Sequence, residues 1–306
     1  MIMNLLLTGA FQYSEYQTQR LIDLGFVVYY MQQEKDVLPI DASKIDAVVC
    51  NALFLYHNID EFVQLKYIQL TSAGLDRVPL DKIESRGITL FNARGVYSIP
   101  MAEWVLFRTL EHYKHATHFR TAQQNALWSK DRSLREICGT HVAIIGAGSV
   151  GREVAKRFKA FGSYNIGFDI FRSSHCEYFE EIDHIDSIFN RIGEFDIVVV
   201  TAPLTQQTFH MISKSLILAM KHKAVLVNIA RGALVNESEL CEALQIRKDI
   251  HAMLDVFEVE PLSVDSTLWS MPNVSISPHN SFVSDGNSIR MFNVIYNNLS
   301  AYINKI

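Results

Sequence analysis

The sequence of 306 residues lacks the features that mark several specialised classes of protein. No apolar run approaches the roughly 18 residues of a membrane-spanning helix, and residues 1–7, although apolar, lack the basic leader and cleavage site of a signal peptide. The net charge of −5 includes no block of like charge, so neither a nucleic acid nor a membrane surface is an expected partner. The sequence also lacks repeats and low-complexity tracts.

Cysteine is scarce as well. The four cysteines lie far apart in the sequence and share no spacing typical of metal ligands; they are Cys50, Cys138, Cys176 and Cys241. We expect them to be unpaired thiols in a reducing compartment, which predicts a cytoplasmic protein with no metal site.

What the sequence does contain is typical of a globular α/β protein. Hydrophobic residues make up 49% and charged residues 20%, and the length fits two lobes with separate cores. Short β-rich runs alternate with amphipathic segments, and several runs are continuously apolar, as in parallel strands covered on both faces. This alternation predicts doubly wound parallel sheets. The expected strands are 5–7, 26–30, 47–50, 67–70, 89–92, 142–145, 166–168, 197–201, 224–228 and 253–255, with another apolar strand within residues 272–278.

Two segments mark the expected boundary between the lobes. Residues 92–100 lead into a long helix, and Pro100 suits a first helical turn because its missing N–H costs nothing there. Residues 277–280 lead into a final helix over about 284–304. We therefore expect one lobe to be inserted into the other. The expected domains are residues 1–98 plus 283–306 and residues 99–282.

A glycine-rich loop directly follows the expected strand at 142–145. Its spacing is Gly146-x-Gly148-x-x-Gly151, and it opens an amphipathic helix. Three spaced glycines alone could form only a tight structural turn, but a strand before them and a helix after them are the context of a dinucleotide site. The glycines allow the turn, the approach of backbone N–H groups to a pyrophosphate, and close helix–strand packing. The expected cofactor contacts here are Gly146, Gly148, Ser149, Val150 and Gly151.

The acidic residue at the end of the next expected strand is Asp169. A carboxylate at this place accepts hydrogen bonds from the adenosine ribose and repels a 2′-phosphate, which favours NAD over NADP. Arg172 lies three residues further on and could instead hold a 2′-phosphate, so NADP is the second option. A charged side chain at a strand end can also be merely solvated.

Three further side chains follow expected strands, whose carboxyl ends line the ligand crevice of a doubly wound sheet: Arg231, Glu260 and His279. An arginine can hold a substrate carboxylate with two hydrogen bonds. A histidine can protonate a carbonyl oxygen as hydride arrives, and a carboxylate can orient that histidine. The set therefore predicts reduction of a 2-keto acid. Because the sequence has eleven histidines, His279 on its own could also be a structural residue.

Together, these motifs resemble the D-isomer-specific 2-hydroxyacid dehydrogenases. The resemblance extends through most of the chain, in the segments 71–76, 102–103, 143–152, 202–205, 228–233, 254–261 and 278–279. It implies a Rossmann NAD-binding domain inserted into a flavodoxin-like catalytic domain. It also implies an NAD(H)-dependent oxidoreductase that interconverts a small D-2-hydroxy acid and its 2-keto acid. A homodimer is implied too, formed through the helix that runs from Pro100 toward Gln124.

The resemblance also implies a role for each residue. Arg231 would bind the substrate carboxylate and carbonyl, His279 would be the acid/base, and Glu260 would be its partner. Backbone N–H groups at Ala73 and Gly74 would help to hold the substrate carboxylate. The nicotinamide carboxamide would bind Asp255, and the cofactor cleft would be lined by Ala202, Pro203, Ile229 and Ala230.

Two residues depart from the pattern that the resemblance leads us to expect. Phe282 stands where small residues are common and could narrow the substrate pocket. Arg94 could contact a second anionic group of the substrate or simply be solvated. The chain ends soon after the last helix, so the regulatory extension of some phosphoglycerate dehydrogenases is not expected.

The sequence leaves two other functions open. Relatives of this fold serve as non-catalytic, NAD(H)-sensing co-repressors, although such a sensor has no need of an acid/base pair. A dehydrogenase for another small substrate, such as formate or phosphite, is the third option.

Overall fold

The computed structural model describes residues 3–173 and 176–305 of the chain. The chain forms two compact units, and each is described here by itself. Unit 1 comprises Met1–Tyr97 and Ser284–Ile306, and unit 2 comprises Ser98–Val283. The chain therefore passes from unit 1 to unit 2 and back again.

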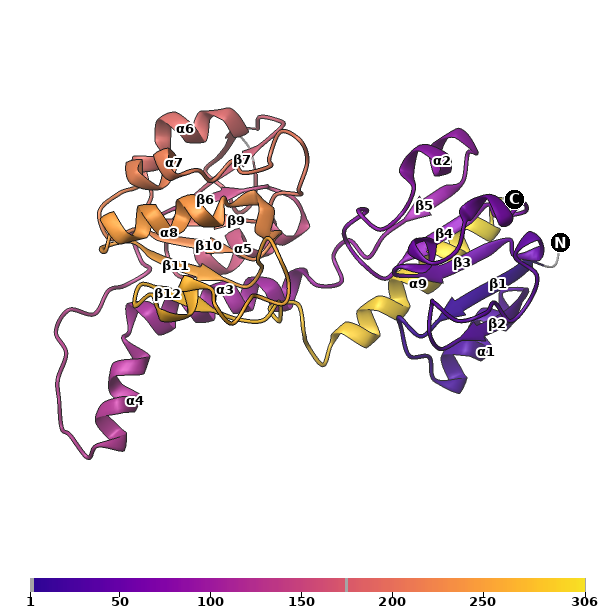
Figure 1. The fold of residues 1–306 in the computed structure, drawn as a ribbon, viewed down its shortest axis with the longest axis horizontal. Helices are drawn as coiled ribbons and strands as arrows, with labels where there is room; N and C mark the ends of the chain where they lie inside the picture. The colour runs from indigo at the N-terminus through magenta and orange to yellow at the C-terminus, as the bar shows by residue number, and fades with distance from the viewer. Residues whose placement is uncertain (1–2, 174–175, 306) are drawn as a thin grey trace. The chain divides into compact units, whose positions relative to one another are not determined.

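Unit 1 is built on five parallel strands in the order β2-β1-β3-β4-β5 (Figure 1). The order is the flavodoxin-like one, with its reversal between β1 and β3. The strands are β1 (Met3–Thr8), β2 (Phe26–Met31), β3 (Ala47–Cys50), β4 (Tyr67–Leu70) and β5 (Thr89–Phe91). The helices are α1 (Glu15–Asp23), α2 (Leu80–Ser85) and α9 (Asn287–Ile303), with 3₁₀ turns at Ala42–Lys44, Leu53–Leu55 and Ile59–Glu61.

The core of unit 1 is completed by α9, from the end of the chain. Its residues Phe292, Ile295 and Leu299 are buried in one apolar cluster with Leu5 and Leu7 of β1. In Figure 1 the yellow α9 accordingly lies against the indigo and purple strands. Because successive side chains of a strand point to opposite faces, the next residues along β1 and its neighbours cover the other face. That second cluster includes Leu6, Val48, Ile68 and Ile83.

Unit 2 is built on seven parallel strands in the order β12-β11-β10-β9-β6-β7-β8. The direction of crossover reverses between β6 and β9, and open α/β sheets bind ligands outside the carboxyl ends of strands at such a switch point. The strands are β6 (His141–Ile145), β7 (Tyr164–Asp169), β8 (Glu181–His184), β9 (Ile197–Val200), β10 (Val225–Asn228), β11 (His251–Leu254) and β12 (Val274–Ile276).

Helices cover both faces of this sheet. On one face lie α3 (Ser98–Tyr113) and α5 (Ser149–Ala160), and on the other lie α6 (Ile188–Arg191), α7 (Lys214–Ala219) and α8 (Glu237–Ile246). The central strands are therefore apolar on both faces, as β9 shows with four buried aliphatic residues in succession. A further helix, α4 (Ala116–Gln124), follows α3, and 3₁₀ turns lie at Ile185–Ser187, Ile192–Glu194, Gly232–Leu234 and Thr267–Ser270.

The predicted α/β fold is confirmed, and each strand expected from the sequence is present. The sequence did not predict β8, which is an edge strand with one buried residue, Ile182, among polar neighbours. The prediction of one long helix from Pro100 toward Gln124 is wrong. The helix ends at Tyr113, and His115, with a left-handed φ of 49°, separates it from α4.

Candidate active site

The glycine-rich loop joins β6 to α5, and its glycines have different environments. Gly146 has a φ of 99°, and a Cβ atom there would lie 2.6 Å from the backbone N of Ala202. A Cβ atom on Gly151 would overlap the carbonyl oxygen of Gly146. Contacts with neighbouring backbone therefore explain why positions 146 and 151 carry no side chain. A Cβ atom on Gly148 would meet nothing within 4 Å, so no protein group accounts for that glycine.

The same loop fits the pyrophosphate of a dinucleotide. Gly148 is the N-cap of α5, a helix of 12 residues. The N–H groups of Gly148, Ser149 and Val150 donate to no acceptor within the described parts of the chain. Free N–H groups at a helix N-terminus attract anions, and the open space at Gly148 leaves room for one to approach.

Asp169 ends β7 and is tied to the glycine-rich loop. Its Oδ2 accepts a hydrogen bond from the N–H of Ala147 at 2.6 Å, and its Oδ1 accepts one from the N–H of Ile170 at 2.7 Å. Arg172, the competing candidate, forms an ion pair with Asp183, with 3.2 Å between Nε and Oδ1. Asp169 is thus bonded to the glycine-rich loop, whereas Arg172 is paired with Asp183.

Arg231 follows β10, in a turn that is held by Asn228. The side-chain amide of Asn228 donates to the carbonyl of Arg231 at 2.9 Å and accepts from the N–H of Ala230 at 3.1 Å. A Cβ atom on Gly232 would overlap the backbone of Phe257, so this turn packs directly against the loop after β11. The arginine is thereby placed at the carboxyl end of the sheet.

Asp255 follows β11 and organises the histidine loop. It is fully buried, and its carboxylate accepts hydrogen bonds from the N–H groups of Asn280 and Ser281, each at 2.9 Å, and from the hydroxyl of Ser277. Its carbonyl accepts the N–H of His279 at 2.7 Å. Since buried hydrogen bonds to a charged group are strong, Asp255 holds residues 277–281 in one conformation.

His279 and Glu260 form the pair that the sequence predicted as an acid/base and its partner. The Nδ1 atom of His279 lies 2.7 Å from Oε2 of Glu260, while Oε1 of Glu260 accepts the N–H of Phe257 at 3.0 Å. A carboxylate at Nδ1 fixes the tautomer with its proton there and leaves Nε2 for another partner. Phe282 packs its ring edge to face on His279, with ring centroids 5.7 Å apart.

A third carboxylate lies beside this pair. Burial raises the pKa of Glu237, and the nearby carboxylates of Glu258 and Glu260 raise it further. Glu237 and Glu258 also bond each other's backbone N–H groups. The loop that carries Glu260 is therefore anchored to α8.

The predicted residues of unit 2 thus lie on adjacent strand ends. Arg231 follows β10, Asp255 and Glu260 follow β11, and His279 follows β12, and these three strands are neighbours in the sheet. Buried Ile229 and Ala230 follow β10, and Ala202 and Pro203 follow β9 next to the glycine-rich loop. The predicted substrate residues Ala73 and Gly74 belong to unit 1, after β4, and their role stays a prediction.

Sequence reasoning missed several residues that hold this site. Ser277, which bonds Asp255, and Asn228, which holds the turn of Arg231, both lie inside segments that the sequence had singled out. Thr201 was treated only as the end of a strand, yet its hydroxyl donates to the carbonyl of Gly146 at 2.7 Å. A polar residue at the end of an apolar strand is the only sequence signal that could have identified Thr201.

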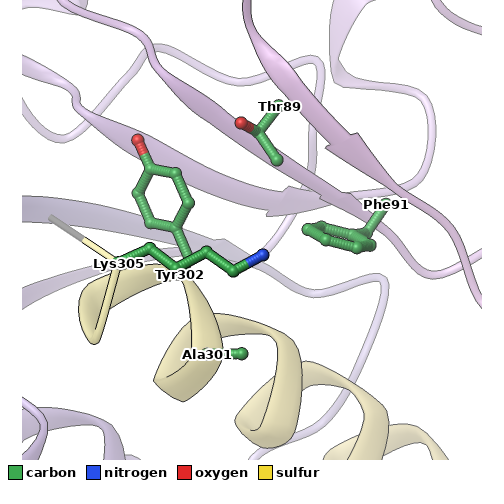
Figure 2. A pocket seen from close by; sticks show the side chains of 5 residues that line it. All are labelled: Thr89, Phe91, Ala301, Tyr302 and Lys305. Atoms are coloured by element: carbon green, nitrogen blue, oxygen red, sulfur yellow. The ribbon is translucent and has the colours of Figure 1, made fainter.

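Other features of the chain do not compete with this site. A cavity of about 280 Å³ lies in unit 1 between β5 and the end of α9 (Figure 2), among Thr89, Phe91, Ala301, Tyr302 and Lys305. None of these residues was a predicted site residue. Within residues 3–173 and 176–305, no cluster of three potential metal ligands occurs. In the same described ranges, every helix is too short or too polar to span a bilayer.

Several known proteins are similar to this chain in sequence and in fold. Residues 106–281 match the family model described as D-isomer specific 2-hydroxyacid dehydrogenase, NAD binding domain. The chain is 32% identical over 251 residues to hydroxypyruvate reductase of Thermotoga maritima, covering 80% of this chain and 78% of that protein. It is also 32% identical over 222 residues to D-3-phosphoglycerate dehydrogenase of Methanocaldococcus jannaschii, covering 72% of this chain but only 42% of that protein.

A solved structure shows the same fold over nearly the whole chain. It is a D-isomer specific 2-hydroxyacid dehydrogenase family protein from Aeromonas salmonicida subsp. salmonicida, with a TM-score of 0.84 and 24% identity, covering 99% of this chain and 96% of that one. Fold and site together define an NAD-binding α/β oxidoreductase. The chain belongs to the D-isomer specific 2-hydroxyacid dehydrogenase family, which confirms the predicted family, enzyme class and NAD-binding fold.

Proposed function

We propose that the protein transfers a hydride between NAD(H) and a small D-2-hydroxy acid or its 2-keto acid. The observation that carries the proposal is the His279–Glu260 pair, at 2.7 Å, which joins the ends of β12 and β11. Asp255 also follows β11, and Arg231 follows β10, the next strand of the sheet. A protein that only senses the cofactor has no need of such a pair.

Each of these residues has a distinct chemical task. In the direction of reduction, Nε2 of His279 donates a proton to the carbonyl oxygen as hydride reaches the carbonyl carbon, so the products are the hydroxy acid and NAD⁺. Glu260 keeps the imidazole oriented and stabilises its protonated form. Arg231 holds the substrate carboxylate through its planar guanidinium.

The cofactor is proposed to lie along the carboxyl ends of the unit 2 strands. The N–H groups of residues 148–150 would hold the pyrophosphate, Asp169 the adenosine ribose, and Asp255 the nicotinamide carboxamide, with Ala202, Pro203, Ile229 and Ala230 lining the cleft. When bound, NADH supplies the hydride. The carboxylate of Asp169 and the ion pair of Arg172 with Asp183 both favour NAD over NADP.

The two units would have different binding roles. We propose that unit 1, close to residues 1–98 plus 283–306, supplies the substrate loop at Ala73 and Gly74, and that unit 2, close to residues 99–282, binds the cofactor. The four cysteines form no disulfide, which supports a cytoplasmic location. Exposed apolar side chains on and after α3 and α4 support a homodimer, including Phe107, Leu127 and Trp128.

The decisive experiment is a substrate panel with both cofactors. Purified protein should consume NADH with glyoxylate, hydroxypyruvate or a longer 2-keto acid, and kcat/KM with NADH should exceed that with NADPH. Asp169→Ala should narrow the difference between the cofactors, whereas Arg172→Ala should not. Bound NADH without turnover of any 2-keto acid would contradict the enzymatic function and favour a cofactor-sensing role.

A further inference from the structure

The segment after β4, residues 71–74, has an unusual distribution of hydrogen bonds. All four of its carbonyl groups accept one: those of Thr71, Ser72, Ala73 and Gly74. The N–H groups of Ser72, Ala73 and Gly74, in contrast, donate to no acceptor in the parts of unit 1 that the structure describes. Consecutive free N–H groups can form a donor site for an anion, so the segment has the donors that a carboxylate needs.

The first of the groups that fix this segment is the phenol of Tyr97. Its hydroxyl donates to the carbonyl of Thr71 at 2.6 Å, across 26 residues of sequence. Burial raises the pKa of Tyr97, so the phenol remains a donor at all physiological pH values. Tyr97 is the last residue before the chain leaves unit 1, and Arg290 of α9 holds its neighbour Val96 through a 2.7 Å bond from Nε to the carbonyl.

The second group is the side-chain amide of Asn92, which follows β5. Its Nδ2 donates to the carbonyl of Ala73 at 2.7 Å, and its Oδ1 accepts the N–H of Arg94 at 3.2 Å. The N–H of the intervening residue Ala93 donates to the carbonyl of Ser72 at 2.9 Å. The turn at residues 92–94 therefore bonds the segment through the side chain of Asn92 and through the backbone N–H of Ala93.

We propose that Tyr97 and Asn92 are positioning residues for the reaction: by holding the carbonyls of Thr71 and Ala73, they keep the N–H groups of residues 72–74 directed to the substrate carboxylate. The inference rests on the proposed function, because it assigns this segment to the substrate. Neither side chain touches the reacting atoms. Their effect is on the binding of the carboxylate, which is the same in the ground state and in the transition state.

This reasoning predicts a particular kinetic signature. Loss of uniform binding raises KM and leaves kcat nearly unchanged. A single hydrogen bond contributes a net amount that corresponds to about a three- to tenfold change in affinity. Tyr97→Phe removes the phenol donor and keeps the ring. Asn92→Ala removes the donor to Ala73 without adding a charge beside the proposed carboxylate site. Each variant should raise KM for the 2-keto acid about three- to tenfold and the double variant by more, with kcat and NADH affinity unchanged.

The test measures kcat, KM and NADH dissociation constants for these variants. It also measures binding of oxamate, a non-reacting 2-keto acid analogue, to the NADH complex. The matched control is Tyr30→Phe, which removes an exposed phenol bonded to Gln32 in the same unit. Unchanged KM and oxamate affinity in both variants would overturn the inference but would not contradict the proposed enzymatic function. Equal losses of kcat, NADH affinity and thermal stability would also overturn it, because they would indicate a general structural role.

Failure of the proposed function looks different in the same experiment. A wild-type protein that neither turns over 2-keto acids nor binds oxamate would remove the proposed function and the inference with it. A wild type that binds oxamate without turnover would contradict the catalytic function alone, and weaker oxamate binding in Tyr97→Phe and Asn92→Ala would still support their positioning role.

Discussion

At the scale of single residues, the imidazole of His279 is constrained from three directions. Glu260 bonds Nδ1, the carbonyl of Asp255 accepts the backbone N–H, and the ring of Phe282 packs against the imidazole. His279 itself has a left-handed φ of 50°. The site therefore fixes the direction of Nε2 before any substrate arrives.

The substitution His279→Asn tests the proposed acid/base. Asparagine tolerates a left-handed φ, so the loop should keep its conformation. Without a group that can transfer a proton, kcat should fall by about 10²–10⁴, whereas the dissociation constant for NADH should hardly change. Steady-state kinetics and an NADH titration measure both. The control is His222→Asn, which removes an exposed histidine, and a drop of only a few-fold in the His279 variant would refute the assignment.

Site residues were predictable from the sequence where their role depends on neighbouring residues in the chain. The glycine spacing, Asp169 and His279 each follow an apolar strand, and the sequence displays that relation directly. Tyr97 and Ser277 were not predictable in this way. Their hydrogen bonds span 26 and 22 residues, so only the folded chain shows which carbonyl or carboxylate they meet.

At the scale of elements, α3 contacts β11 of the unit 2 sheet through two stacked histidines. His112 of α3 and His251 of β11 have ring centroids 4.2 Å apart, and Nε2 of His251 lies 2.8 Å from the hydroxyl of Ser275 on β12. Burial, followed by nearby positive charge, lowers the pKa of His112 to about 4 and that of His251 to about 3. The charged groups responsible are Arg135 and His115 for His112, and His112 and Arg108 for His251.

This contact predicts acid sensitivity. Between about pH 6.5 and pH 4 the unfolded chain binds more protons at these two histidines than the folded chain does, so the free energy of unfolding falls as the pH falls. Above pH 6.5 both states are neutral there and the effect vanishes. The double variant His112→Phe/His251→Asn should lose less thermal stability than the wild type between pH 7 and pH 4.5. Parallel curves for the two proteins would contradict this account, and His222→Asn is again the control.

The elements themselves were predictable because the central strands are continuously apolar and the helices between them are amphipathic. The sequence could not show where the helix after Pro100 breaks. Nothing local distinguishes His115 from a helical residue, but Nδ1 of His115 meets Asp131 at 2.6 Å, 16 residues later. Strand β8 was missed because one buried side chain gives no periodic pattern.

At the scale of the whole molecule, the exposed segment of unit 2 bears on assembly. Helix α4 and residues 125–134 lead away from the seven-stranded sheet of that unit (Figure 1). They are mostly exposed, with Trp128 at 95%. A side chain of this size left in water is a marker of an interface.

The proposed homodimer can be tested by its mass and by substitutions that should disrupt it. Light scattering coupled to size-exclusion chromatography should give twice the chain mass. The double variant Leu127→Ser/Trp128→Ser should shift the protein toward the monomer at low concentration, because it removes exposed apolar area that only a partner would bury. Val264→Ser, at an equally exposed valine elsewhere in unit 2, should not. A monomeric wild type, or a dimer unaffected by the double variant, would argue against this interface.

The return of the chain to unit 1 has a consequence for how the protein is made. Residues 3–97 leave the ribosome before unit 2, but the apolar face of β1 is not covered until Phe292, Ile295 and Leu299 of α9 have followed the whole of unit 2. At about 5–20 residues per second, that delay is on the order of ten seconds or longer. Unit 1 therefore begins synthesis before unit 2 but completes its core after it, and during that interval the nascent chain presents an uncovered sheet face to chaperones.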